Sequence, residues 1–502
     1  MELLTLFFII LVLLLLIILI RHFHLKKRRQ NRPPSPPSLP LIGHLHLLKE
    51  PMNQTLQALS AKYGDILSLK FGVRQVLLLS SPAAVDECFT KNDIIFANRP
   101  STLSTKHFSY NNTTISIAPY GDHWRNLRRL ATLEIFSPAR IAAFTTTRRR
   151  ELMLLMRELS RDDGGGTTKV VDLKSKFIEL AFNVLSMTIA GKRYYGENVV
   201  DAEEARRVRF IMREMLQYSG NTNLGDLLPF LQWIDFQGLE KRFANLMEKL
   251  DRFMQELVNE RRETPSFGES STMIDHLLSL QEKEPDYYTD ELIKGIILVL
   301  LVAGTDTMSI SMEWTMALLL NHPECIKKIK DEIDANVLED RLLEEQDLSK
   351  LSYLQNVITE TLRLYPPVPF LIPHQSSEDC KVGGYDIPKG TMLLVNLWAM
   401  QRDSRFWDEP EQFKPERHEE GGRREEEAFM LPFGSGRRKC PGGGIATRVL
   451  GLALGTMIQC FEWERVSEEM VDMTEGTGFS IPKVKPLEAL CKPREGMMKF
   501  FV

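Results

Sequence analysis

The stretch Phe433-Gly434-Ser435-Gly436-Arg437-Arg438-Lys439-Cys440-Pro441-Gly442 carries the strongest chemical signal in the chain. It places a cysteine in a glycine-rich loop, beside a run of basic residues and just before a long helical segment, residues 445–461. Glycines let the backbone pass close to a flat cofactor, and cationic neighbours together with a helix start favour the thiolate of Cys440 over its thiol. The alternative is a structural cysteine in a turn, which does not account for so specific a combination. We therefore predict that the sulfur of Cys440 is a ligand of a bound cofactor.

The length and composition around this loop indicate one large domain. The chain has 502 residues, and residues 41–502 contain no long linker and no internal repeat. The net charge of −4 gives no reason to expect nucleic acid as a partner. The six cysteines are scattered without a CxxC pair, which favours a reducing compartment and argues against a disulfide scaffold or a structural zinc site.

The N-terminus is predicted to be a membrane anchor. Residues 3–20 form an apolar run of 18 residues, which rises about 27 Å as a helix, close to the thickness of the hydrocarbon core of a bilayer. We assign residues 1–22 to a transmembrane signal-anchor helix and residues 23–40 to a basic flank and a stiff Pro-rich hinge. A cleaved signal peptide is the rival interpretation, but Glu2 replaces the basic n-region and no small-residue cleavage site follows.

Within the domain, hydrophobic periodicity predicts a mainly α fold with a minor β-sheet region. Residues 65–72 and 75–79 are expected to form two short strands around a turn, and most long segments after residue 83 show helical periodicity. A helix expected over residues 289–320 is apolar on every face in its middle, so it should cross the core. Another, over residues 354–364, should end before Pro366-Pro367.

Two pairs of residues on these helices have candidate roles. Glu360 and Arg363 are three positions apart and share one helix face, although such pairs are usually solvated surface ion pairs. Asp306 and Thr307 follow Gly304 in the middle of the apolar helix, where a carboxylate is costly unless it has a function or a partner. A mid-helix threonine more commonly hydrogen-bonds its own helix backbone.

The cysteine loop resembles the haem-ligand signature of the cytochrome P-450 family, Phe-x-x-Gly-x-Arg-x-Cys-x-Gly. Its five fixed positions are matched by Phe433, Gly436, Arg438, Cys440 and Gly442. The resemblance extends from Pro33 to the C-terminus and implies the cytochrome P-450 fold. It also implies haem b (iron protoporphyrin IX) as cofactor, with Cys440 as the axial ligand of the iron. A thiolate in this position favours cleavage of the O–O bond of dioxygen.

Further roles follow from the same resemblance. Glu360 and Arg363 would form a buried structural triad with Arg417 of Pro415-Glu416-Arg417, although position 418 is His where the family usually has Phe. Thr307 would steady dioxygen and Asp306 would help to deliver protons, with Gly304 leaving space beside the helix. The residues expected to contact the haem propionates are Trp124, Arg128, Arg438 and His374.

The resemblance also implies partners and a location. Electrons would come from NADPH through NADPH–cytochrome P-450 reductase, and the exposed basic residues of 437–439 would dock it. The enzyme would be a single-pass protein of the endoplasmic reticulum membrane, in contact with lipid, with a cytosolic catalytic domain. Residues 223–233 would form an apolar roof over the pocket that dips into the membrane. The segments 101–118, 368–372 and 476–479 would face the substrate.

Finer features resemble plant enzymes of specialised metabolism, closest to isoflavone 2′- or 3′-hydroxylases and flavonoid hydroxylases. These features include Asn396-Leu397-Trp398-Ala399 and Asp472-Met473-Thr474-Glu475-Gly476. The expected function is hydroxylation of a small apolar aromatic metabolite with O2. Phenol coupling and methylenedioxy-bridge formation stay open as alternatives, as do a haem-thiolate isomerase or dehydratase and a non-catalytic membrane haem sensor. The sequence does not identify the natural substrate, the regiochemistry or the oligomeric state.

Overall fold

The first two strands form where alternating apolar residues predict them. In the computed structural model, β1 (Ile66–Phe71) buries every second residue, and β2 (Arg74–Leu79) pairs with it in antiparallel register, Phe71 opposite Arg74. The turn between them requires glycine, because Gly72 has φ +58° and a Cβ there would lie 1.9 Å from the carbonyl oxygen of Leu227. The strand turn therefore packs directly against the segment that contains Leu227.

The structure describes residues 31–161, 168–197, 199, 201–218, 223–235, 237–265, 271–419 and 430–501. The predicted anchor, residues 1–22, and residues 23–30 of the flank lie outside this part. Residues 31–40 dock on the strands of the domain, since Ser68 N–H of β1 donates to the Pro34 carbonyl oxygen and Asp386 N–H to that of Asn31. Over this length the Pro-rich segment is docked on the domain.

The strands lie in three small sheets. β1 and β2 continue through β7 (Met392–Val395) to β4 (His374–Gln375), in the order β1-β2-β7-β4, with β2 and β7 parallel. The three-stranded sheet has the order β3-β9-β8, and β5 pairs with β6. The bounds of these strands are β3 (Lys169–Asp172), β5 (Cys380–Val382), β6 (Tyr385–Ile387), β8 (Phe461–Arg465) and β9 (Glu488–Pro493).

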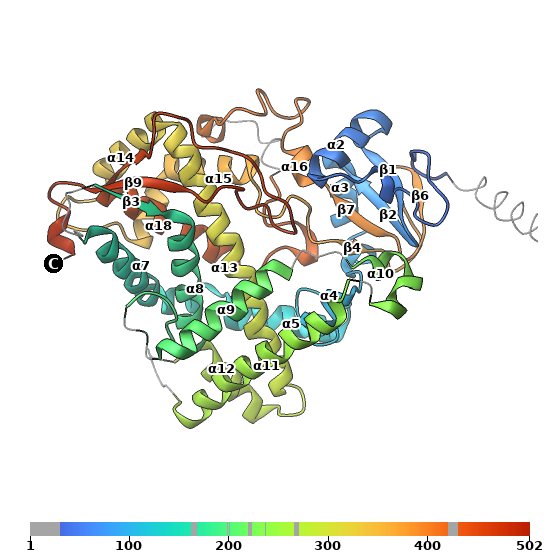
Figure 1. The fold of residues 1–502 in the computed structure, drawn as a ribbon, viewed down its shortest axis with the longest axis horizontal. Coiled ribbons are helices and arrows are strands. Elements are labelled where there is room, and N and C mark those ends of the chain that lie inside the picture. Colours follow the sequence, from blue (N-terminus) through green and yellow to red (C-terminus); the bar gives the residue numbers. More distant parts are fainter. Residues whose placement is uncertain are drawn as a thin grey trace, which may run out of the picture.

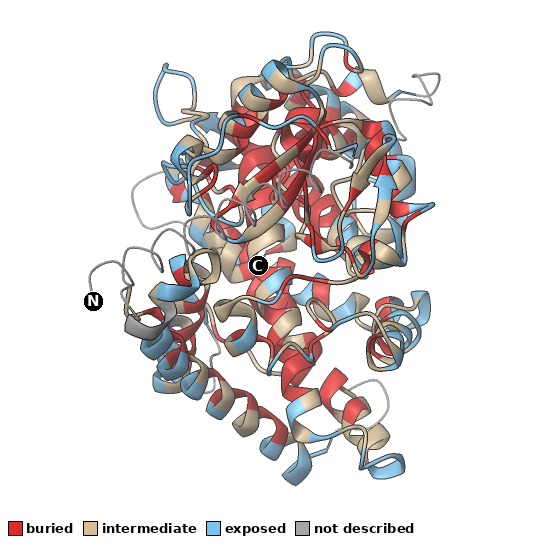
Figure 2. Cartoon of the chain, turned by 90° about the vertical axis from the view of Figure 1, so that its right-hand side faces the viewer, coloured by how far each residue is buried: buried red, intermediate tan, exposed pale blue. Residues whose placement is uncertain are grey.

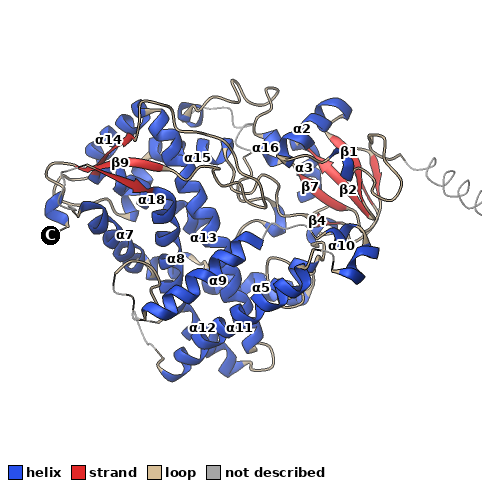
Figure 3. Ribbon diagram, viewed as in Figure 1, coloured by secondary structure: helices blue, strands red, loops and turns tan. Residues whose placement is uncertain are grey.

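Helices make up most of the described chain (Figure 3), which confirms the predicted fold class. The α-helices are α2 (Met52–Tyr63), α3 (Pro82–Phe89), α4 (Leu103–Phe108), α5 (Asp122–Leu130), α6 (Pro138–Ala143), α7 (Thr145–Ser160), α8 (Leu173–Ala190), α9 (Ala202–Tyr218), α10 (Leu224–Leu227), α11 (Leu239–Glu263), α12 (Met273–Lys283), α13 (Asp290–Asn321), α14 (Pro323–Asn336), α15 (Ser352–Leu364), α16 (Leu397–Met400) and α18 (Gly443–Cys460). Shorter helical turns are η1 (Leu45–Leu47), η2 (Ile95–Ala97), η3 (Ala131–Ile135), η4 (Pro229–Ile234), η6 (Glu345–Lys350), η7 (Pro415–His418), η8 (Gly436–Arg438) and η9 (Met498–Phe500).

Helix α13 runs through the middle of the molecule (Figure 1). The hydroxyl of Thr289 accepts a hydrogen bond from Leu292 N–H at its start, where Asp290 and Glu291 also favour the helix dipole. It packs against α8, α11, α15 and α18, and buried residues line most of its length, as Figure 2 shows for the interior as a whole. The predicted core-crossing helix is therefore confirmed.

Among the described residues, α13 and α18 are long and apolar enough to cross a membrane. Both are mostly buried in the protein, with 61% and 72% of their apolar windows inside. They are core helices that pack against each other and against α15, and α18 begins directly after the cysteine loop.

Candidate active site

The cysteine loop is closed by a backbone hydrogen bond and by glycine geometry. Cys440 N–H donates to the carbonyl oxygen of Phe433 over 2.8 Å, so the ends of the loop meet. Gly436 has φ +65°, and a Cβ there would lie 2.7 Å from Oδ1 of Asp93. Asp93 in turn accepts a hydrogen bond from Arg437 N–H, over 3.1 Å. Only glycine fits at position 436, and the loop is held against the segment after α3.

The thiol of Cys440 is accessible, unlike the buried thiols of Cys88, Cys325, Cys460 and Cys491. Desolvation by the surrounding protein nevertheless raises the pKa of Cys440. Hydrogen bonds from the N–H groups of Gly442 and Gly443, at the start of α18, and the charge of Arg128 act in the opposite direction. The N–H groups thus stabilise negative charge on a sulfur that is free to bind a ligand.

Arg438 turns inward from this loop onto backbone carbonyls. Its guanidinium donates to the carbonyl oxygens of Ala97 (2.7 Å), Ile115 (3.1 Å) and Ala118 (2.5 Å). It lies over the ring of Trp124, at 4.4 Å from the centroid, and Trp124 Nε1–H also donates to Ile115. Burial lowers the pKa of Arg438 to about 10. The structure therefore places Arg438 over the ring of Trp124, and the contact of both residues with haem propionates stays a prediction.

Arg99 is a functional candidate that the sequence analysis missed. Its side chain is buried and donates to the carbonyl oxygens of Ser116, Ile372 and Pro373. Burial and the nearby charge of Arg438 place the pKa of Arg99 well below its usual range. Residue 99 sits in a short loop segment without periodicity, so its sequence neighbourhood contains no signal of this role.

Arg128 and His374, the other two residues expected to contact the haem propionates, also donate to backbone carbonyl oxygens. Arg128 Nη1 donates to the carbonyl oxygen of Lys439 over 2.6 Å, and His374 Nδ1–H donates to that of Phe96 over 2.6 Å. Burial and the charges of Arg99 and Arg438 place the pKa of His374 well below its ordinary value. The ring is therefore neutral, and its Nε2 carries only a lone pair until it takes up a proton.

We refer to the three arginines Arg99, Arg128 and Arg438, together with the neutral ring of His374 beside them, as the cation cluster. In the described part of the chain, none of the three arginines forms an ion pair with a carboxylate. A buried charge without a counter-ion is costly, so the cluster fits a ligand that brings anionic groups next to Cys440. The two carboxylates of haem meet this requirement, and a guanidinium binds a carboxylate in bidentate geometry.

The predicted oxygen-activation residues lie on α13. Thr307 Oγ1 donates to the carbonyl oxygen of Ala303 over 2.7 Å, and Ala303 is exposed although α13 as a whole is mostly buried. Burial raises the pKa of Asp306, whereas a hydrogen bond with Ser480 and the charge of Lys174 oppose this rise.

Gly304 lies on the side of α13 that faces α8. A Cβ at this position would lie 2.7 Å from Cδ1 of Leu185, so the glycine permits close packing of the two helices. Its contact with the cofactor stays a prediction.

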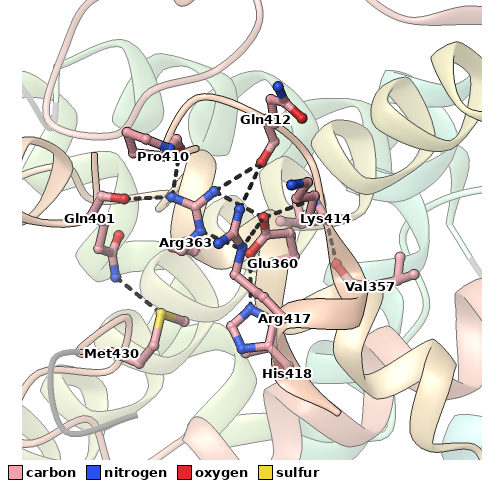
Figure 4. Close-up of polar contacts among 12 residues, drawn as sticks. Val357, Glu360, Arg363, Gln401, Pro410, Gln412, Lys414, Arg417, His418 and Met430 are labelled. Atoms are coloured by element: carbon pink, nitrogen blue, oxygen red, sulfur yellow. Dashed lines mark hydrogen bonds and ion pairs between the residues drawn. The ribbon is translucent and has the colours of Figure 1, made fainter. Parts of the chain in front are cut away.

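Glu360 and Arg363 on α15 are fully buried, each with 0% of the side chain exposed. Arg363 donates through Nε and Nη2 to the two oxygens of Glu360, over 2.8 and 2.9 Å. Arg417 of η7 donates to Oε1 over 2.9 Å, so the three residues predicted to form a triad are in contact (Figure 4). Arg363 also donates to the carbonyl oxygens of Gln401 and Pro410, which ties α15 to the segment that follows α16.

His418 extends this network, which the sequence analysis did not predict. Its Nε2–H donates to Oε2 of Glu360 over 2.9 Å (Figure 4). Burial would raise the pKa of Glu360, but hydrogen bonds from Arg363 and His418 and the charges of Arg363 and Arg417 lower it to about 2. The carboxylate is therefore ionised and satisfied on both oxygens.

Comparisons with known proteins agree with this geometry. Residues 33–488 match the family model described as Cytochrome P450. Similar proteins include Cytochrome P450 81Q32 of Catharanthus roseus, 53% identical over 93% of each chain. The (+)-piperitol/(+)-sesamin synthase of Sesamum radiatum is 50% identical over 93% of this chain and 91% of its own. An isoflavone 3′-hydroxylase of Medicago truncatula is 48% identical over 92% of each chain.

A solved structure supports the same assignment. A zebra fish cytochrome P450 with progesterone has a TM-score of 0.75 and 26% identity, and the match covers 89% of this chain and 100% of that one. The cysteine loop, the cation cluster beside it and the overall architecture thus have one common explanation: the chain belongs to the cytochrome P450 family of haem-thiolate monooxygenases.

Proposed function

We propose that this monooxygenase inserts oxygen into an apolar aromatic plant metabolite of the phenolic class, with ring hydroxylation as the principal reaction. The observation that carries the proposal is the 48% identity, over nearly the whole chain, with an isoflavone 3′-hydroxylase. The segments proposed to face the substrate are consistent with an apolar ligand, since Phe108 and Leu371 are buried and Phe479 is 41% exposed.

We assign the binding of haem to the residues described above. Cys440 would supply the sulfur ligand, and the cation cluster with Trp124 would hold the propionates, close to the loop residues Phe433, Gly436 and Gly442. When bound, haem supplies the iron at which dioxygen is reduced with electrons that a separate reductase takes from NADPH. Glu360, Arg363 and Arg417 would keep the scaffold beneath the loop in place.

Two residues of α13, Asp306 and Thr307, would deliver protons during the reaction. Because Thr307 Oγ1 donates to Ala303, its lone pairs stay free to accept a hydrogen bond from a water molecule that acts as proton donor. Asp306, whose pKa is raised by burial, can exchange a proton closer to neutral pH than an exposed aspartate can. We propose that the two side chains deliver protons to the reacting dioxygen.

The second candidate reaction is methylenedioxy-bridge formation. It is favoured by the 50% identity with the (+)-piperitol/(+)-sesamin synthase. The two reactions differ in product mass, because hydroxylation adds one oxygen atom whereas bridge formation removes two hydrogen atoms.

The proposed location is the surface of the endoplasmic reticulum membrane, with the domain on the cytosolic side. Exposed apolar side chains gather around the β1–β2 turn: Leu41 (75% exposed), Val73 (57%) and Phe230 (60%). The turn and the segment 223–235 are joined, since Val73 N–H donates to the carbonyl oxygen of Leu227. An exposed apolar patch that includes Leu41, which follows the predicted anchor and hinge in the sequence, suits contact with lipid.

The test uses the full chain in microsomes with NADPH–cytochrome P450 reductase and a panel of phenolics, with products identified by mass spectrometry. We expect a product that requires both NADPH and the reductase. The Cys440→Ser variant should lose the thiolate-type Soret band of the reduced carbon monoxide complex and the product together. Turnover without reductase would instead favour an isomerase or dehydratase, and haem binding without any product would favour a sensor. For the location, tryptophan fluorescence of a Phe230→Trp variant should be quenched by brominated lipid.

A further inference from the structure

We propose that Tyr110 is a positioning residue for the haem site. Together with Asp251 and Lys294 it fixes one end of the loop between α4 and α5, residues 109–118, which we call the strap. The other end of the strap binds two arginines of the cation cluster. The proposal rests on the haem-binding role given to that cluster above, and it adds to that role three residues from outside the cluster.

The first observation is that the far end of the strap holds guanidinium groups of the cation cluster. Arg438 donates to the carbonyl oxygens of Ile115 over 3.1 Å and of Ala118 over 2.5 Å. Arg99 donates to the carbonyl oxygen of Ser116 over 3.3 Å. The positions of these three oxygens restrict the directions in which the two guanidinium groups can point, so a shift of the strap changes the orientation of both groups.

The second observation is a polar contact that fastens the near end of the strap to two helices. The Tyr110 hydroxyl donates to Oδ1 of Asp251 on α11 over 2.9 Å, and the Lys294 ammonium of α13 lies 2.6 Å from the same oxygen. This ammonium is also 5.9 Å from the centroid of the Tyr110 ring. Burial and the hydrogen bond to Asp251 raise the pKa of Tyr110, so the phenol stays protonated and remains a donor. One carboxylate oxygen thus joins the strap to both α11 and α13.

The third observation is the backbone of the strap beside this contact. Tyr110, Asn111 and Asn112 have φ values of 48°, 56° and 63°, so three consecutive residues are left-handed without a glycine among them. This conformation is costly for residues other than glycine, and it persists only where neighbouring contacts hold it. The hydroxyl of Thr113 supports the turn by donating to the Tyr110 carbonyl oxygen over 2.8 Å. The side-chain contacts of Tyr110 hold the same turn from outside the strap.

The fourth observation is that the two ends of the strap are tightly connected. Thr114 is 5% exposed and packs on α13 at Gly295, where a Cβ would lie 3.1 Å from Thr114 Cγ2 and 3.5 Å from Tyr110 Cδ2. The Thr114 carbonyl oxygen accepts hydrogen bonds from the N–H groups of Ile117 and Ala118, over 3.1 and 2.7 Å. The turn that presents oxygens to the arginines is therefore seated on α13 next to Tyr110, so a movement of Tyr110 also displaces this turn.

The test measures how fast the full-length enzyme, loaded with haem, loses its haem to an excess of apomyoglobin. Absorbance follows this transfer without any turnover. Tyr110→Phe keeps the ring and removes the hydrogen bond to Asp251, and we expect the transfer to become about fivefold faster. Lys294→Met removes the ammonium from the same carboxylate and should accelerate the transfer about threefold. It is the second variant, which keeps the inference testable should Tyr110→Phe fail to fold.

The matched control is Tyr194→Phe, because Tyr194 makes the same kind of contact elsewhere in the fold. Its hydroxyl donates to Oε1 of Glu204 over 3.1 Å, and the Lys192 ammonium lies 2.9 Å from that oxygen. In the described part of the chain, these three side chains form no hydrogen bond with the strap. We expect haem transfer from Tyr194→Phe to match that of the parent. An equal acceleration in the two Phe variants would show that Tyr110 acts only through general stability, which overturns the inference.

A double substitution shows whether Tyr110 acts through the arginines. Arg99→Leu removes one guanidinium that the strap orients, so we expect Tyr110→Phe to add less than about twofold in this background. Purely additive effects overturn the positioning role. If Arg99→Leu accelerates the transfer while Tyr110→Phe and Lys294→Met do not, only the role of the strap fails. If Arg99→Leu alone leaves the transfer unchanged, the proposed haem-binding role of the cation cluster itself fails, so the two failures are distinguishable.

Discussion

His418 Nε2 lies 2.9 Å from Oε2 of Glu360, so an imidazole joins two arginines around one fully buried carboxylate. Arg363, Arg417 and the backbone N–H of Lys414 provide the other hydrogen bonds to this carboxylate. Position 418 is histidine where the family usually has phenylalanine. This histidine fits the network and adds a hydrogen-bond donor to it.

Replacing this donor should have a moderate effect on stability. His418→Phe keeps an aromatic ring next to Trp407 but removes one hydrogen bond to the carboxylate. We expect the free energy of unfolding to fall by about 1–2 kcal/mol, with the carbon monoxide spectrum retained. Arg363→Ala should cost about 3–5 kcal/mol, because it leaves a buried charge without its main partner. Chemical denaturation measures both, and an equal loss in the two variants would contradict the ranking.

The ionisation of Glu360 predicts a pH dependence of stability. Its pKa is lowered from 4.5 to about 2, so its contribution is fully present above about pH 4.5 and is lost as the pH falls towards 2. That shift corresponds to a contribution on the order of 3 kcal/mol at neutral pH. We expect Glu360→Gln to be less stable than the parent at pH 7 and the difference to shrink as the pH falls below about 4.5. A gap that stayed constant with pH would show that the charge of Glu360 does not stabilise the fold.

The cation cluster predicts how haem is retained. Arg99→Leu removes one buried guanidinium near the proposed propionate site, so we expect the haem content of the purified protein to fall several-fold. Arg437→Leu is the matched control, because Arg437 pairs with Asp93 and is 43% exposed. Pyridine haemochrome assays give the haem-to-protein ratio. Equal retention in both variants would exclude Arg99 from the site.

The hydroxyl of Thr307 has its own test. Thr307→Ala removes the group that accepts a hydrogen bond from a proton donor, while the helix keeps its backbone bonds. We expect more NADPH to be oxidised per product and more hydrogen peroxide to be released, with substrate binding little changed. NADPH oxidation and product formation measured in the same sample give the ratio. Unchanged coupling in Thr307→Ala would remove the role given to this hydroxyl.

The features that could be predicted correctly from the sequence are those that the spacing of nearby residues determines. The spacing within 433–442 predicted a loop that ends at a helix, and the interval between Glu360 and Arg363 predicted a shared helix face, as the structure confirms. Apolar periodicity likewise predicted α13. These features depend on residues close together in the chain, where residue type and period carry most of the information.

What the sequence did not reveal depends on contacts between distant coil segments. Arg99 gains its role from the carbonyl oxygens of residues 116, 372 and 373. The segment that contains Arg99 has no hydrophobic period, so only the folded structure shows which backbone groups surround its side chain. The same holds for residues 31–40, which the sequence predicted as a spacer and which are hydrogen-bonded to Ser68 of β1 and Asp386 of β6.

The positive charge concentrated at Arg99, Arg128 and Arg438 also affects the folding and degradation of the protein before any turnover. Without a carboxylate partner, these charges repel one another and oppose the docking of the segments that carry them. A ligand that neutralises them binds only the native chain and shifts the folding equilibrium towards it by mass action. Newly made chains in a porphyrin-starved cell should therefore be degraded faster, and the steady-state amount of this enzyme should follow the supply of iron and porphyrin.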